Sequence, residues 1–162
     1  MKYKRFVCLL SLLLLSTLIL STCGNQSSDS PSHKKTDFPK VTTPYKPETA
    51  AQNGDVVDVH GTLMNAHIWQ QFLDNVNKNQ EDQVRVTAYT IEGSPIFFEL
   101  VYDGEIIHYT FDNSMDGFGT YSGRPSTICQ GIEIRQNNEG NAYYVFTACD
   151  DKLGNTFSYP AN

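Results

Sequence analysis

The chain has 162 residues, 40% of them hydrophobic and 19% charged, which fits one ordinary globular domain and excludes collagen-like, coiled-coil and fully disordered chains. Its net charge is −6, and without its first 22 residues it keeps all 18 acidic but only nine of its 12 basic residues, a net charge of −9. Nucleic acids and anionic lipid surfaces both require a basic footprint, so neither is expected as a ligand.

The first 22 residues are predicted to be a bacterial signal peptide. A basic start, MKYKR, precedes an apolar run over residues 6–20, which is the layout of an exported chain. The sequence Leu20-Ser21-Thr22-Cys23 then resembles a lipobox, the motif of the lipoprotein-specific signal peptidase. The resemblance implies that Cys23 receives a diacylglyceryl group with palmitate-like acyl chains and becomes the mature N-terminus. The alternatives are an ordinary secretory signal and an uncleaved membrane helix.

A flexible tether is predicted over residues 23–54, and a single small domain over residues 55–162. Ser, Thr, Pro and Lys dominate the tether, which contains four prolines and few bulky apolar side chains. Such a composition buries too little apolar surface to offset the entropy of ordering the chain. The remaining residues suffice for one modest hydrophobic core.

Within the predicted domain, an extended segment over residues 55–61 is followed by a helix over residues 65–77. Asn65 is a plausible N-cap of this helix, and five apolar side chains share one face, namely Ile68, Trp69, Phe72, Leu73 and Val76. Five strands are predicted over residues 84–91, 96–102, 105–111, 128–135 and 142–149. The pattern predicts an α+β fold, in which one amphipathic helix packs on an antiparallel meander sheet of about five strands.

Four short motifs resemble a known family. They are DVVDVHG at 55–61, TIEGSPI at 90–96, YDG at 102–104 and YTFDNS at 109–114. Together they resemble the Bacillus-type lipoproteins that carry domain of unknown function 4362, over most of residues 53–150. The resemblance implies a small, exported α+β domain. It implies no activity, and no functional residue is carried over from it.

The two cysteines of the predicted domain, Cys129 and Cys149, are expected to form a disulfide. Export places them in an oxidising compartment. Each lies ten residues from Glu139, the centre of the predicted turn between the last two strands, so antiparallel pairing puts them opposite each other. The alternative is a metal-binding or catalytic thiol pair, although the sequence contains no CxxC motif.

Glu99 and His108 are the first candidates for chemistry. A two-residue turn at Asp103-Gly104 is predicted, because Asp-Gly is a strong signal for a type I′ hairpin. That turn would place Glu99 opposite His108. The pair could then be an acid–base dyad or an ordinary cross-strand polar contact.

Asp112, Ser114 and Asp116 are the second candidates, as the opening of a calcium loop. They occupy positions 1, 3 and 5 of such a loop, with Gly117 at position 6. Position 12 is Gly123, where a calcium loop has a bidentate Glu, so no metal is assigned. The alternative is that Asp, Asn and Gly occur here as turn formers.

The sequence therefore favours a non-catalytic binding or interaction module at the cell envelope, lipid-anchored on the extracytoplasmic face of the cell membrane. We expect it to contact the membrane through its anchor and to bind an envelope protein, a peptide or a glycan. No nucleic acid and no cofactor are expected. The alternative is a small surface hydrolase or metal-dependent enzyme that uses Glu99 and His108, or Asp112 and Asp116.

Overall fold

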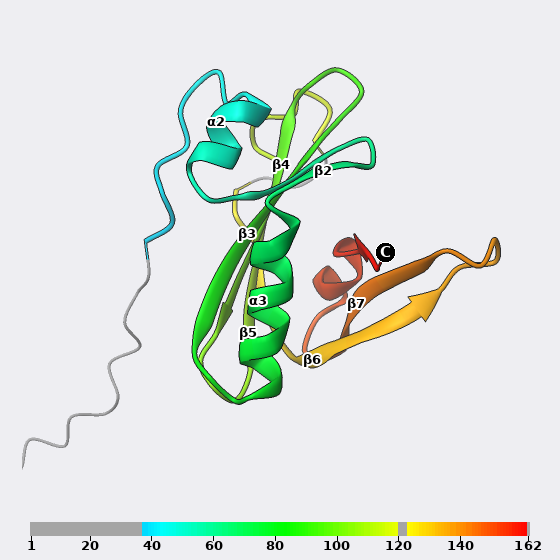
Figure 1. The fold of residues 1–162 in the computed structure, drawn as a ribbon. Helices are drawn as coiled ribbons and strands as arrows, with labels where there is room; N and C mark the ends of the chain where they lie inside the picture. Colours follow the sequence, from blue (N-terminus) through cyan, green and yellow to red (C-terminus); the bar gives the residue numbers. More distant parts are fainter. Residues whose placement is uncertain (1–36, 120–122, 162) are drawn as a thin grey trace, which may run out of the picture. The chain divides into compact units, whose positions relative to one another are not determined.

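The fold is a mixed eight-stranded sheet that curls around one long helix (Figure 1). The computed structural model describes residues 37–119 and 123–161. The strands are β1 (Val56–Val59), β2 (Thr62–Met64), β3 (Asp82–Tyr89), β4 (Pro95–Tyr102), β5 (Ile107–Asp112), β6 (Ser126–Gln136), β7 (Ala142–Cys149) and β8 (Tyr159–Pro160). The helices are α2 (Pro47–Gln52), α3 (Ala66–Asn77) and the 3-10 helix η1 (Lys152–Thr156). Across the sheet the order is β2-β1-β3-β4-β5-β6-β7-β8.

The predicted five-stranded antiparallel meander with a packed helix is wrong. The sheet has eight strands, and β1 and β3 are parallel, whereas the other neighbouring strands are antiparallel. Parallel strands need a crossover connection, and here α3 lies within the connection between β1 and β3. The edge strands β2 and β8 have three and two residues, which is too short for an alternating pattern to reveal them.

The predicted helix is present as α3, and its apolar face lies in the main core. Trp69 and Phe72 are fully buried in that core. Asn65 precedes the helix in a left-handed conformation with φ 58°, and its side chain makes no cap. Instead, its Nδ2 donates to the carbonyl oxygens of Ala51 and Asp55, at 2.8 and 2.9 Å. Asn65 therefore joins α3 to the chain that precedes β1.

Contacts of Trp69 show how far the sheet curls. The centroid of its ring system lies 5.4 Å from that of Tyr144 in β7, and 5.7 and 4.9 Å from those of Phe157 and Tyr159. The last strands of the sheet and the C-terminal segment therefore pack against the same helix that covers β3. We call this helix-covered side the concave face of the sheet.

Residues 37–54 belong to the folded unit, although the sequence assigns them to the tether. They form α2 and bury Tyr45 and Ala50, which are 3% and 0% exposed. These side chains join a second apolar cluster with Phe97, on the side of the sheet opposite the concave face. The folded unit therefore begins before residue 55. Composition averaged over the predicted tether hides the few apolar residues that pack.

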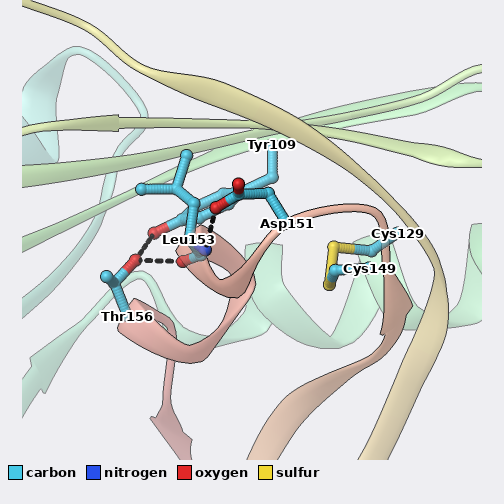
Figure 2. The surroundings of a disulfide bond; sticks show 6 residues. All are labelled: Tyr109, Cys129, Cys149, Asp151, Leu153 and Thr156. Carbon is cyan, nitrogen blue, oxygen red and sulfur yellow. Dashed lines mark hydrogen bonds between the residues drawn. A yellow bond between two sulfur atoms is a disulfide. The ribbon is translucent and has the colours of Figure 1, made fainter.

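The hairpin of β6 and β7 has the register predicted from its turn, with Cys129 opposite Cys149. The two sulfur atoms form a disulfide, 2.08 Å apart (Figure 2). η1 lies beside this disulfide and is held by Thr156, whose hydroxyl group is 2.7 Å from the phenol oxygen of Tyr109. The bridge thus closes the hairpin and adjoins the C-terminal segment.

Candidate functional site

Polar side chains gather on the second face of the sheet, the side opposite α3. Alternation along β3 sends Val84 and Val86 into the main core and sends Arg85 and Thr87 to the second face. All four residues are buried, and so is Asp55, which immediately precedes β1. A buried charge requires a partner, so the contacts of Arg85 define the site.

Each of the three nitrogen atoms of the Arg85 guanidinium donates a hydrogen bond. Nε donates to Oδ1 of Asp55 at 2.9 Å, and Nη2 lies 2.8 Å from the same oxygen. Nη2 also donates to the Tyr45 hydroxyl group at 3.0 Å, and Nη1 donates to the Pro39 carbonyl at 2.9 Å. Arg85 lies on β3, whereas its partners are the residue that precedes β1 and two residues of the segment before α2.

Three aromatic rings surround the same guanidinium. Its central carbon lies 5.6 Å from the ring centroid of Phe38 and 5.8 Å from the centroids of Tyr45 and Phe97. At these distances a desolvated cation gains cation–π stabilisation. Burial alone would lower the pKa of Arg85, but the hydrogen bonds and charge of Asp55 raise it above its ordinary value. Arg85 therefore stays charged.

Asp55 is the anion at the centre of this cluster. Its Oδ2 accepts hydrogen bonds from the hydroxyl groups of Tyr45 and Thr87, at 2.9 and 2.8 Å. The Tyr45 oxygen also accepts a hydrogen bond from Nδ2 of Asn53. Burial, together with the neighbouring Asp55 carboxylate, raises the pKa of Tyr45. Every partner of Asp55 is thus itself fixed, which describes a structural cluster rather than a reactive group.

A hollow of about 240 Å³ opens at this cluster. Its lining includes Phe38, Asn53, Gln83 and Arg85. Gln83 Oε1 is buried and, within the part of the chain that the structure describes, has no hydrogen-bond partner.

A second charged group lies farther along the same face, on β4 and β5. Glu99 and Asp112 come from adjacent strands, and their side chains are 11% and 14% exposed. Both contact Arg124, whose Nη2 is paired with Glu99 and whose Nε lies 3.3 Å from Asp112. The Arg124 side chain is 54% exposed. Nη1 of Arg85 lies 3.6 Å from Glu99 and links the two groups.

Comparison with known families gives one match. The model of the family described as a domain of unknown function, DUF4362, matches residues 53–144. The chain belongs to this family. No curated protein and no solved structure shows significant similarity to the chain. The match concerns the domain alone, so the lipoprotein part of the resemblance stays a prediction.

In this DUF4362 domain the predicted pair of Glu99 and His108 does not form. Glu99 is opposite Thr110, and His108 is opposite Val101. The prediction is wrong because the turn is formed by Gly104-Glu105, with Asp103 and Ile106 closing it, which shifts the register by two residues.

Asp103 explains the shift in register. Its Oδ1 accepts the backbone N–H groups of Glu105 and Ile106, at 2.9 and 2.8 Å. Its Oδ2 lies 2.9 Å from Nε2 of His108. Burial alone would raise the pKa of Asp103, but these three hydrogen bonds lower it to about 2. His108 therefore contacts the turn, and it is not opposite Glu99.

The predicted calcium loop uses its carboxylates for turns. Oδ1 of Asp112 accepts the N–H of Ser114 at 2.9 Å, and Oδ1 of Asp116 accepts the N–H of Phe118 at 3.1 Å. Oδ2 of Asp112 contacts Arg124, as described above. Residues 37–119 and 123–161 contain no group of three or more His, Cys, Asp or Glu side chains that could hold a metal ion.

The remaining predicted residues divide between the described and undescribed parts of the chain. Cys129 and Cys149 are joined, and Cys129 is fully buried against the main core. Cys23, the predicted lipidation site, lies outside the described residues. The sequence did contain a signal for the cluster that was missed: Arg85 is the one charged residue in the apolar run from Val84 to Tyr89. A lone cation in such a strand implies a buried partner.

Proposed function

We propose that the protein is a non-catalytic binding module, anchored through acylated Cys23 on the extracytoplasmic face of the cell membrane. The support for the anchor is the basic start, the apolar run and the lipobox-like Leu20-Ser21-Thr22-Cys23. Two acyl chains give durable attachment, and 13 residues separate Cys23 from Asp37, a number that can span at most about 45 Å. None of the described helices is long and apolar enough to cross a membrane.

The observation that carries the binding role is the pairing of Glu99 and Asp112 with Arg124. Two largely buried carboxylates share a cation that is itself more than half exposed. An arginine or lysine from a partner could replace Arg124 without leaving a buried charge unpaired, because it would supply the same hydrogen bonds. The excess of acidic residues would steer a basic segment towards this face. We therefore infer a basic protein segment of the envelope as the ligand.

The binding role is tested with a synthetic arginine-rich peptide and an acidic peptide of equal length. Arg124→Ala should bind the basic peptide several-fold more tightly than the wild type, because it uncovers both carboxylates. Lys40→Ala is the matched control, since it removes the same charge from an exposed position. Glu99→Gln combined with Asp112→Asn should lower the affinity. Equal affinities of the Arg124 and Lys40 variants would exclude this site.

The anchor is tested separately. We expect wild-type protein expressed in a bacterial host to incorporate labelled palmitate and to stay with the membrane fraction. Cys23→Ala should incorporate no label and either appear in the medium or accumulate unprocessed. A Cys23→Ala protein that is processed and retained like the wild type would contradict the lipid anchor and leave the binding site unaffected.

A further inference from the structure

The distal half of β6 is an unpaired edge of the sheet. β5 pairs with β6 only between Ser126 and Cys129, whereas β7 pairs with it as far as Gln136. Among the residues that the structure describes, no strand pairs with residues 131–136 on the side away from β7. Figure 1 shows this end of the hairpin extending away from β3, β4 and β5. An unpaired edge of this kind can accept another strand.

The backbone groups presented at this edge follow from the hairpin register. The N–H of Asn137 donates to the carbonyl oxygen of Asn141 and closes the turn. Hydrogen-bonded pairs alternate along an antiparallel ladder, so the next such pair with β7 lies two residues before Asn137. The N–H and C=O groups directed away from β7 are therefore those of Ile132, Ile134 and Gln136.

The side chains along the edge carry one acidic and one basic group. Glu133 and Arg135 lie on the same face of the strand, two residues apart, and are 45% and 64% exposed. Ile134 lies on the other face and is 57% exposed. Charges on an edge strand commonly prevent pairing with other strands. Here the two charges have opposite signs and lie two residues apart, so they can attract each other across one register of a pair formed by two copies of this strand.

We propose that this edge binds a second copy of the chain, in an antiparallel pair centred on Ile134. A two-fold axis then passes between the two copies of Ile134, and Ile134 forms a hydrogen-bonded pair with the partner's Ile134. Ile132 forms another such pair with the partner's Gln136. These are the residues whose backbone groups face the open edge, so the ladder is self-complementary.

The charges select the same register. Glu133 falls opposite the partner's Arg135, and by symmetry Arg135 falls opposite the partner's Glu133. Neither pair has backbone hydrogen bonds, and in such pairs the side chains approach most closely. A register centred on Glu133 or on Arg135 would instead place like charges together. The acidic bodies repel each other, but salt screens this repulsion beyond about 8 Å. The contact is short, so the dimer is weak and concentration-dependent.

The test uses full-length chains with two different epitope tags, co-expressed in a bacterial host and co-precipitated after mild detergent extraction. Glu133→Arg alone and Arg135→Glu alone should each lower self-association about tenfold, because each places like charges opposite in both symmetric contacts. A mixture of the two variants should restore it. In the wild type, Nε of Arg135 pairs with the Glu133 carboxylate of the same chain. Neither chain in the mixture has this intrachain pair, so restoration reports contacts between chains. A mixture no better than the single variants would overturn the proposal.

Cysteine crosslinking gives an independent readout. In the proposed dimer, Ile134→Cys places two thiols on a pair with Cα atoms about 5.5 Å apart, within disulfide range. It should form a crosslinked homodimer under oxidation. Ile91→Cys is the control, because Ile91 is also exposed but lies in the β3–β4 turn. Equal crosslinking at both positions, or crosslinking of the Ile134 variant only to a different protein, would overturn the proposal.

Discussion

The two faces of the sheet are held by different kinds of interaction. On the concave face, Trp69 and Phe72 of α3 pack against aromatic side chains, and a disulfide closes the adjoining hairpin. On the second face, a salt bridge between Asp55 and Arg85 is buried beneath residues 37–54. In an apolar core the cost of a substitution grows with the volume that it adds or removes, whereas the loss of one partner of a buried ion pair leaves a whole charge uncompensated. The faces should therefore respond differently to mutation.

The largest effect is expected on the second face. Arg85→Met should lower the free energy of unfolding by about 4 kcal/mol, because it leaves the Asp55 carboxylate buried without a cation. Adding Asp55→Asn should restore at least half of this loss, since the remaining group is neutral. Urea denaturation measures both variants, with the exposed Lys40→Met as a control within about 0.5 kcal/mol of the wild type. A loss below about 1 kcal/mol for Arg85→Met would remove the distinction between the faces.

The next effect concerns the disulfide. Cys129→Ser combined with Cys149→Ser should lower stability by about 3 kcal/mol, because the bridge closes a loop with a sequence separation of 20 residues. Chemical denaturation of the oxidised wild type and the variant gives the difference. A reductant should destabilise the wild type and leave the serine variant unchanged. Equal stabilities would show that packing alone closes the hairpin.

A single methyl group tests how tightly η1 packs on the disulfide. The Cβ of an alanine at Gly154 would overlap Sγ of Cys149, so the helix or the bridge must move. Gly154→Ala should therefore lower stability by about 2 kcal/mol. Gly117→Ala is the matched control, because its Cβ meets nothing within 4 Å. Thermal unfolding with similar midpoints for both variants would mean that the concave face adapts easily.

The smallest effect concerns the partly buried carboxylate of Asp103 in the turn between β4 and β5. The pKa of Asp103 is about 2 in the folded chain and near 4 when unfolded, so its stabilisation is complete above about pH 4 and disappears as the pH falls through 2. Asp103→Asn should lower stability at pH 6 by about 1 kcal/mol, a value reduced by solvent screening. Between pH 5 and 2 the variant should lose less stability than the wild type. Parallel pH profiles would contradict this assignment.

Patterns with local causes were predictable from the sequence. The helix over residues 65–77 and the register of Cys129 with Cys149 follow from side-chain periodicity and from one turn, and the structure confirms both. The parallel pairing of β1 with β3 was not predictable, because it depends on where the chain returns after α3. The predicted pairing of Glu99 with His108 was wrong because of a local feature of one turn. Asp103 hydrogen-bonds the turn and displaces it by one residue, which moves the register by two.

The extent of the folded unit bears on how the domain can be isolated. A fragment limited to the family match, residues 53–144, would lack Tyr45 and its contacts with Asp55. It would also lack Cys149 and therefore carry a lone thiol at Cys129. Such a fragment would expose the charged groups around Asp55 on one face of the sheet. On the other face it would expose apolar core side chains and the free thiol of Cys129. We expect it to aggregate through both faces. The segment that the family model recognises is thus shorter than the segment that the domain needs to bury its own core.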